Sequence, residues 1–465
     1  MEDLKPYPKY KTTKLNWLNQ VPIDWDIKRT AALFHEKKTL NKEYQFKQAF
    51  QFKFGEIVNK KQIGTQEELK ETYQKYTIVD KDDIVINGLN LNYDFLTQRV
   101  GKVRESGIIT SAYISISPQK EEIEPRYACY LLKTLDNRKM LNGMGTGIRL
   151  TLSFPELKKQ YLPLPPLSEQ IHIANYLDYK VALINKFIKD KKKEIILLKE
   201  QKQAEINQAV TRGVNPNAKM KDSGISWIGE IPEHWEVKRL KHFAKINPSI
   251  QEQIKKYDLN DSVVFLAMEN ISVDGVINNI ERRQIKDVKS GYTSFAKNDV
   301  VIAKITPCFE NGKGAFLSEL ETNIGFGTTE LIVLRPNCDI LGVYLYFILK
   351  SDFVIKIGAD FMTGSAGQKR IPTNFIENFR IGFPTIQEQQ IIVDTLNLKL
   401  ARIEKAITTI ENQIKLMQDY KISLISDVVT GKVDVRNIAV QNTEDEPEED
   451  VEEMEDKEQI ENSEE

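Results

Sequence analysis

The chain has 465 residues, a formal net charge of −2 and 41% apolar side chains, which is an ordinary soluble composition with room for two or three domains. Its longest apolar runs are too short to cross a bilayer, and its N-terminus lacks the basic-then-apolar order of a secretory signal, so we expect a cytoplasmic protein. The cysteines, Cys129, Cys308 and Cys338, lie far apart with no histidine cluster nearby. This spacing favours reduced thiols and argues against a zinc site.

The small net charge conceals a large asymmetry. Residues 441–465 contain 14 acidic residues and one lysine, a net charge of −13, which leaves +11 on the rest of the chain. A basic body suits a polyanionic partner. Segment 437–465 is expected to be a disordered acidic tail, because it has too little apolar surface to offset its ordering entropy. A solubilising role is favoured over competition with a polyanion for the basic body.

The chain begins with a segment that recurs later. Residues 6–29 and 216–239 match at a constant shift of 210 residues, through prolines, lysines, an arginine and tryptophans. Together the two copies hold all four tryptophans of the protein: Trp17, Trp25, Trp227 and Trp235. A match of this kind indicates two homologous halves.

Each half continues into a middle region, about 26–164 and 236–383, in which the same outline is filled by different residues. The outline is a buried strand after an acidic turn, a later strand ended by proline, a helix and a small-residue loop. In the first half these are expected at 83–86, 112–117, 126–135 and 143–149, and in the second at 299–302, 330–335, 341–353 and 364–370. Similar frames with divergent contents are expected if each middle recognises something different.

A long helix ends each half, at 169–214 and 388–433, and the two copies match at a shift of 219 residues. Both open with Pro-x-x-x-Glu-Gln, and both carry a seven-residue apolar repeat that predicts a coiled-coil seam. At 1.5 Å per residue each helix would be roughly 60 Å long. The seam positions are Ala174, Leu177, Val181, Ile184, Ile188, Lys191, Ile195, Leu198, Lys202, Glu205 and Ala209, and Val393, Leu396, Leu400, Ile403, Ile407, Ile410, Ile414, Met417, Lys421, Leu424 and Val428.

Neither seam is stable in water, so we expect the two helices to pack on each other, and a two-fold relation between the halves makes that pairing antiparallel. The matched seam lysines, Lys202 and Lys421, either fix the register at some cost in stability or extend their ammonium groups to solvent. The expected fold is therefore α+β, with two similar globular domains joined by two long antiparallel coiled-coil helices in a pseudo-two-fold internal repeat. The expected boundaries are 1–167 and 215–384 for the globular domains, 168–214 and 385–436 for the helical regions, and 437–465 for the tail.

No catalytic centre is recognisable. The chain has no Gly-x4-Gly-Lys-Ser/Thr phosphate loop, no dinucleotide fingerprint and no His-Glu-x-x-His metal motif. Glu236-Val237-Lys238 and Asp26-Ile27-Lys28 share the Glu-x-Lys or Asp-x-Lys ending of many nuclease sites. Neither follows a strand that brings a second carboxylate near, so a structural role at the start of a strand is favoured over two-metal catalysis.

Loops after the matched strands instead carry polar groups suited to nucleic acid. Asn and Arg offer bidentate hydrogen bonds to base edges, whereas Lys and Thr suit phosphates. Each residue singly is more often a solvated surface group, but the set on a basic body favours DNA contact. The candidate DNA-binding residues are Asn87, Asn90, Asn92, Arg99, Lys102 and Arg149 in the first half, and Lys304, Thr306, Asn311, Lys313, Lys369 and Arg370 in the second.

Three of these motifs resemble those of the DNA-specificity subunits of Type I restriction-modification systems: the run Lys221–Val237, the Pro-x-x-x-Glu-Gln helix starts, and the run Gly364–Pro372. The resemblance covers about residues 6–436. The first half departs from the pattern, because Lys11-Thr12-Thr13-Lys14 stands in place of Lys221-Asp222-Ser223-Gly224, and Gly143–Leu150 lacks the Gln-Lys of the later loop.

The resemblance implies two target recognition domains, each reading one half of a split, asymmetric double-stranded DNA site. It implies helical regions that set the unread spacer and dock two modification subunits, which bring S-adenosylmethionine and methylate adenine at N6. Restriction subunits using ATP and magnesium would complete the nuclease, so no catalysis, cofactor or metal is expected on this chain itself. Recognition domains a few tens of Å apart would read half-sites about one helical turn apart.

Two other functional classes stay open. The first is a stand-alone nuclease or methyltransferase that uses Glu236 or an unrecognised site, and activity of the purified chain without partners would identify it. The second is a structural coiled-coil adaptor, which leaves two large, divergent polar middles unexplained. Salt-dependent DNA affinity would exclude the adaptor.

Overall fold

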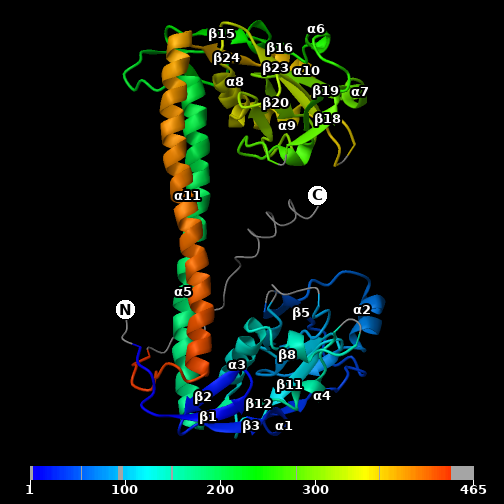
Figure 1. Cartoon of the computed structure of the whole chain (residues 1–465), viewed down its shortest axis with the longest axis vertical. Coiled ribbons are helices and arrows are strands. Elements are labelled where there is room, and N and C mark those ends of the chain that lie inside the picture. The colour runs from blue at the N-terminus through cyan, green and yellow to red at the C-terminus, as the bar shows by residue number, and fades with distance from the viewer. Residues whose placement is uncertain are drawn as a thin grey trace. The chain divides into compact units, whose positions relative to one another are not determined.

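The computed structural model describes residues 4–53, 55–92, 98–147, 150–278, 280–365 and 367–440. The Cα positions separate into two compact units, one formed by residues 1–192 with 411–465 and the other by residues 193–410. Figure 1 labels the elements, and each unit contains part of both long helices. None of the helices in the described part of the chain combines the length and apolarity that crossing a bilayer requires. Most of the expected acidic tail, from residue 441, lies outside the described residues.

The first unit is built on an antiparallel sheet with the strand order β4-β11-β8-β9. These strands are rich in isoleucine and valine, and Ile84, Ile86 and Ile116 are fully buried beneath helix α3 and the start of the long helix α5. Pro118 ends β11, as expected of a residue that has no N–H to donate to the ladder. The bounds are β4 (Phe34–Glu36), β8 (Ile84–Ile86), β9 (Val100–Lys102), β11 (Ile114–Pro118), α3 (Pro125–Asn137) and α5 (Leu167–Arg212).

Shorter elements complete the first unit. The tryptophan segment forms a hairpin of β1 (Tyr10–Leu15) and β2 (Leu18–Pro22), followed by β3 (Asp26–Arg29), which pairs with β12 (Tyr161–Leu164). A peripheral part adds two strand pairs and a helix whose N-terminus is capped reciprocally by Thr65 and Glu68. The remaining bounds are α1 (Thr30–Leu33), β5 (Phe50–Lys53), β6 (Glu56–Asn59), α2 (Gln66–Tyr73), β7 (Thr77–Val79), β10 (Gly107–Ile109), a 3-10 turn (Asn142–Met144) and α4 (Phe154–Leu157).

The second unit repeats this frame. Its antiparallel sheet has the order β16-β23-β20-β21, strand for strand equivalent to the first, and again a hairpin precedes a strand that pairs with the strand leading into the long helix. The expected internal repeat and α+β fold are confirmed. The bounds are β13 (Met220–Asp222), β14 (Glu230–Pro232), β15 (Glu236–Arg239), β16 (Ala244–Ile246), β20 (Val300–Ala303), β21 (Gly314–Phe316), β23 (Leu331–Pro336), β24 (Arg380–Phe383) and α11 (Ile386–Val429).

The peripheral parts of the two units differ. In the second unit a separate sheet with the order β18-β17-β22-β19 packs one face on Val301 and Val333 of the frame and the other on two short helices. No such sheet order occurs in the described part of the first unit. The bounds are α6 (Gln251–Ile254), β17 (Ser262–Leu266), a 3-10 turn (Met268–Asn270), β18 (Glu281–Gln284), α7 (Ile285–Val288), β19 (Thr293–Ala296) and β22 (Ile324–Gly327).

One expected helix is wrong in extent. The segment expected as a single helix at 341–353 is two helices, α8 (Gly342–Leu349) and α9 (Asp352–Asp360), followed by α10 (Thr373–Asn378). Ser351 breaks the helix with extended backbone, because its buried hydroxyl turns back to donate to the carbonyl of Ile348. The side-chain oxygen of Asn207 then accepts the N–H of Asp352 and fixes the start of α9 against α5.

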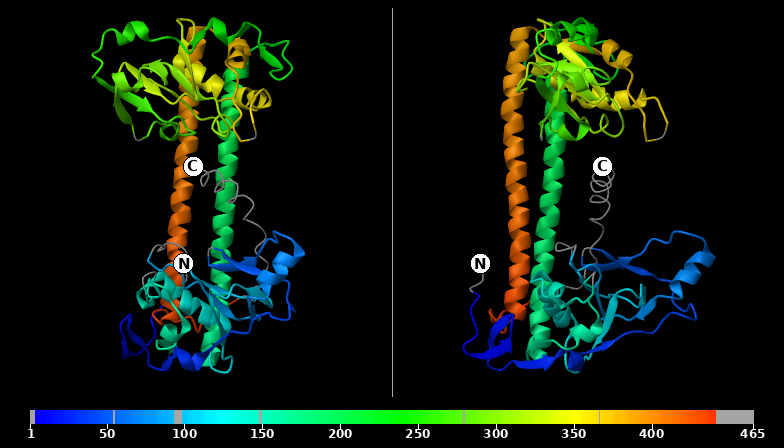
Figure 2. Two further views of the ribbon diagram at one scale, coloured as in Figure 1. Left: turned by 90° about the vertical axis from the view of Figure 1, so that its right-hand side faces the viewer. Right: turned by 45° about the vertical axis from the view of Figure 1, so that its right-hand side comes forward.

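The two long helices pair side by side in antiparallel directions within each unit (Figure 2). In the first unit Lys421 donates to Asn185 at 3.0 Å, and in the second Lys399 meets Glu205 at 2.6 Å and Lys202 contacts Glu404. Every expected seam position is buried or half-buried, so the predicted seam is confirmed. Lys202 and Lys421 both bond across the seam, which supports the register role rather than simple extension to solvent.

The ends of the helices differ slightly from expectation. Both begin two residues earlier, and α11 ends at Val429 instead of 433, because Gly431 adopts a left-handed φ of 72° and the Lys432 N–H bonds the carbonyl of Asp427. Gly213 ends α5 in the same way, with φ of 71°.

The repeated Glu-Gln at each helix start anchors the globular part. Glu169 accepts hydrogen bonds from Trp25 at 2.9 Å and Tyr7 at 2.6 Å, and Glu388 accepts one from Trp235 at 3.0 Å. The neighbouring glutamine is buried in both copies and bonds the backbone at the start of α3 or α8. The tryptophan segment and the Glu-Gln helix start therefore contact each other in each unit, which explains why the two sequence repeats recur together.

Candidate nucleic-acid interface

In the second unit, two loops far apart in sequence are joined edge to edge. The loop that follows β20 begins at Lys304, and the Thr306 N–H donates to the carbonyl of Lys369 at 3.0 Å. The Lys369 N–H donates to the Thr306 hydroxyl at 3.1 Å, and the Ile371 N–H donates to the carbonyl of Lys304 at 2.8 Å. This ladder brings Lys304, Thr306, Lys369 and Arg370 together, as recognition of one nucleic-acid strand would require.

Arg370 is held by an acid that the sequence analysis did not single out. Its Nε and Nη2 donate to the two carboxylate oxygens of Glu330, both at 2.9 Å, in a bidentate ion pair. The hydrogen bonds from Arg370, with the nearby charge of Lys304, hold the pKa of Glu330 below its usual range. Glu330 therefore sets the direction of the guanidinium and competes with any phosphate for it.

Asn311 and Lys313 lie on the same loop as it returns to β21. Gly312 between them has a left-handed φ of 68°, and its carbonyl accepts a hydrogen bond from the Lys350 ammonium at 3.0 Å. The same ammonium also contacts the carbonyl of Val273. Lys350 thus ties the loop to a neighbouring turn, and burial lowers the pKa of Lys350 to about 8.

The first unit contains an equivalent pair of loops. The Leu91 N–H donates to the carbonyl of Leu150 at 3.2 Å, and the Leu152 N–H donates to that of Gly88 at 2.9 Å. A side chain at Gly88 would come within 2.5 Å of the Leu152 carbonyl oxygen, so glycine is required for this close approach. The loop after the central strand therefore meets the glycine-rich loop in both units.

Arg99 was expected to contact DNA, which requires an exposed side chain, but it is buried. It is 2% exposed, and its guanidinium donates to the carbonyls of Asn87 and Leu89 at 3.1 and 2.7 Å. Arg99 therefore shapes the loop from within, because a buried guanidinium that is bonded to backbone carbonyls is not presented to a ligand. Asn90, on the same loop, is exposed with a left-handed φ of 50°.

The remaining first-half residues are placed unevenly. Asn87 is half-buried and accepts the Leu89 N–H at 3.2 Å. Lys102 is 26% exposed and pairs with Asp82 at 3.3 Å, which places it at the end of β9. The side-chain oxygen of Asn92 is buried and meets no donor within the described residues. Arg149 lies outside the described residues.

The residues considered for catalysis lie on β3 and β15. Glu236 is exposed and pairs with Lys238 at 2.7 Å. Across the described ranges, no group of three or more His, Cys, Asp and Glu side chains is placed to hold a metal ion. His172 bonds the carbonyl of Val435 and His234 bonds Glu388, so both serve contacts between elements.

Sequence reasoning missed Glu330 and Lys350 as site residues. A search for basic and amide groups passes over an acid, and the position of Glu330 just before β23 gave no signal of a partner 40 residues away. Lys350 lies at the end of α8, where a lysine is ordinarily explained by its favourable interaction with the helix dipole alone.

Comparison with known proteins matches the chain to one family model, described as the Type I restriction modification DNA specificity domain, over residues 22–197 and 232–416. The chain is 41% identical over 212 residues to the EcoAI specificity subunit of Escherichia coli, covering 45% of this chain and 34% of that protein. It is 25% identical over 378 residues to the MjaVIII specificity subunit of Methanocaldococcus jannaschii, covering 78% and 82%. Both relatives are type I restriction enzyme subunits. The matches to the EcoAI and EcoEI subunits span only about a third of those proteins.

Two solved structures share the fold. One, described as the structural basis of complex assembly and conformational transition of the type I R-M system, has a TM-score of 0.65 at 12% identity and covers 89% of this chain and 99% of its own. The HsdS subunit from Thermoanaerobacter tengcongensis has a TM-score of 0.51 at 14% identity and covers 90% and 100%. At these identities the likeness concerns the fold alone.

Proposed function

Because the chain belongs to the type I restriction-modification DNA specificity family, we propose that it reads double-stranded DNA with one recognition domain per half-site and has no catalytic role of its own. The observation that carries the proposal is the joined loop pair that recurs in both units. A repeated frame whose joined loops differ in sequence suits a split target whose two halves differ in sequence.

The proposed contact surface in the second unit consists of Lys304, Thr306, Lys369 and Arg370, with Asn311 and Lys313 on the returning loop. Lys and Thr would hold phosphates, and Asn and Arg would read base edges. In the first unit we propose Asn87, Asn90, Asn92, Lys102 and Arg149, with Arg99 as the residue that shapes the loop of Asn87 and Asn90.

The proposed domains are 1–167 and 215–384 for recognition and 168–214 and 385–436 for the helices, with a tail at 437–465. The helices would dock two modification subunits that carry S-adenosylmethionine, and restriction subunits that use ATP and magnesium would join the complex. Exposed apolar side chains on the helices, such as Leu197, Leu398 and Leu416, support docking. The proposed location is the cytoplasm, on the host DNA.

Mapping methylated adenines across the genome tests this function. We expect cells that carry the chain with its modification subunits to methylate one split motif, and cells that lack the chain to lose that motif alone. Methylation of the same motif without the chain would contradict the proposal.

A further inference from the structure

The strand pair β15–β24 in the second unit places two arginines directly opposite each other. Arg239 and Arg380 are cross-strand partners in this antiparallel pair. Side chains at opposite positions of a strand pair lie about 5 Å apart at Cβ, and like charges placed there destabilise the pair. An arrangement of this kind calls for a compensating anion.

The described residues place no such anion beside either arginine. Arg239 donates to the side-chain oxygen of Asn378 at 3.2 Å, a neutral acceptor. Within the described part of the chain, neither arginine has a carboxylate at ion-pair distance. Of the neighbouring cations, Lys238 is paired with Glu236 at 2.7 Å.

The two arginines line a pocket. Its volume is about 460 Å³, and Lys238, His242 and Ser223 line it as well. The backbone of the Ser223–Ile225 turn is already used, since Gly224 donates to Asp222 and Ile225 donates to the Ser223 hydroxyl. The available donors are therefore side chains, and three of them, Arg239, Arg380 and Lys238, are cationic.

The first unit provides an internal comparison. Tyr161 occupies the place of Arg380, opposite Arg29, so the arginine pair is absent there. Ala32 stands at the position of His242, and Lys28 is paired with Glu122. The same frame is therefore stable without the cationic cluster, which means that the fold does not require it.

We infer that this pocket in the second unit binds a phosphate group. Two guanidinium forks that meet across a strand pair match the several oxygens of a phosphoryl group, and bidentate Arg–phosphate pairs are strong and directional. The site shares no residue with the proposed recognition loops, and inorganic phosphate tests it whether or not those loops bind DNA. The phosphate belongs either to a duplex backbone or to a small phosphorylated ligand.

The test uses the full-length chain and the substitution Arg380→Tyr, which copies the residue of the first unit. Arg380→Gln is a second variant, and Lys245→Gln on β16 is an exposed control with a matched loss of charge. One arm measures the melting temperature in sodium phosphate against sodium chloride of equal ionic strength. The other measures affinity for a labelled duplex of arbitrary sequence over a range of salt.

In the chloride buffer both Arg380 variants should melt at or above the wild-type temperature, because the like-charge pair is gone. If the phosphate is part of a duplex backbone, both variants lose one phosphate contact. The slope of log affinity against log salt, which is negative, should then decrease in magnitude by about 0.9 in both variants and stay unchanged in the control. If it belongs to a small ligand, the variants should lose only the extra melting stability in phosphate. Equal behaviour of wild type, variants and control in both arms would overturn the inference, as would an equal fall in slope for Lys245→Gln.

Discussion

Among single residues, Glu330 controls how Arg370 can be used. The side chains of Glu330 and Arg370 are 23% and 44% exposed, so solvent screens the pair and its contribution to stability is small. The pair matters more for binding, because a phosphate must compete with the Glu330 carboxylate for the Arg370 guanidinium.

We predict that Glu330→Gln strengthens DNA binding by about two- to five-fold, because the carboxylate no longer competes with a phosphate for Arg370. Duplex affinity at fixed salt measures the effect. Glu321→Gln is the matched control, because it removes the same charge. Glu321 forms an ion pair with Arg282 at 2.6 Å and lies outside the two loops in sequence. An equal gain in both variants would mean that only net charge matters.

Lys350 acts from beneath the same loop, and its protonation couples to folding. Burial, the largest effect, lowers its pKa from 10.5 to about 8, while Asp274 opposes the shift and Lys202 adds to it. Between these two values the unfolded chain binds more protons than the folded chain, so stability rises with pH across that window and is lowest below pH 8.

The substitution Lys350→Met removes this titration together with the two carbonyl contacts. We predict that the difference in unfolding free energy between wild type and variant shifts in favour of wild type as the pH is raised from about 7 to about 10. Urea unfolding at several pH values measures it. A difference that does not change with pH would show that folding leaves the pKa of Lys350 unshifted.

At the scale of elements, the start of each long helix is fixed by a glutamine that bonds three backbone groups. The side chain of Gln389 is fully buried, accepts the Leu341 N–H at 2.9 Å and donates to the carbonyls of Asp339 and Pro384 at 3.0 and 3.2 Å. These bonds join α8 to α11, and Gln170 makes the corresponding bonds between α3 and α5.

We predict that Gln389→Ala destabilises the second unit by about 3 kcal/mol, because it leaves buried backbone groups without partners. Gln390→Ala is the control on the same helix, since Gln390 is exposed and its side chain bonds the exposed Asp394, and it should change stability by less than about 0.5 kcal/mol. Chemical unfolding followed by circular dichroism compares them. Similar losses in the two variants would contradict the proposed anchor.

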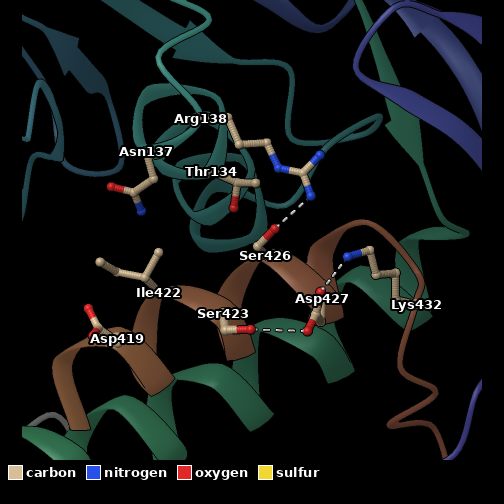
Figure 3. Close-up of a pocket in the computed structure, with 9 residues that line it drawn as sticks. All are labelled: Thr134, Asn137, Arg138, Asp419, Ile422, Ser423, Ser426, Asp427 and Lys432. Atoms are coloured by element: carbon tan, nitrogen blue, oxygen red, sulfur yellow. Dashed lines mark hydrogen bonds and ion pairs between the residues drawn. The ribbon is translucent and has the colours of Figure 1, made fainter. Parts of the chain in front are cut away.

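The first unit is closed by contacts between its first residues and the segment that follows α11. The Asp434 N–H donates to the carbonyl of Lys5 at 2.8 Å, and the Tyr10 hydroxyl donates to that of Gly431 at 3.0 Å. Close to this junction, a shallow pocket between α3 and the end of α11 is lined by Arg138, which donates to Ser426, and by Lys432, which pairs with Asp427 (Figure 3). Its charged groups form contacts that join α3 and the segment after α11 to the end of α11.

At the scale of the whole molecule, the two frames carry recognition loops that differ in sequence, so the two halves of the target should be separable. We predict that exchanging residues 26–164 for the corresponding region of a relative changes one half of the methylated motif and preserves the other. Methylation mapping in cells with the partner subunits reads the result. A change in both halves would show that the recognition domains are not independent modules.

Much of the architecture was predictable from the sequence, because internal duplication and apolar periodicity are local signals. The seam positions, the matched strands and the two tryptophan segments were all found in this way, since a repeat of 210 or 219 residues is visible without knowledge of contacts. The helix break at Ser351 was not, because it depends on Asn207 of another helix accepting the Asp352 N–H.

The composition of the candidate site required the tertiary structure. Arg99 and Arg370 are alike as sequence letters, yet one is buried beneath a loop and the other lies on its surface. Glu330 and Arg370 are 40 residues apart, and Arg239 faces Arg380 only because β15 pairs with β24. Sequence alone thus determined which elements form and that they form twice, since those choices depend on neighbours along the chain. Only the tertiary structure decided which charges meet, because ion pairs and strand partners depend on distance in space.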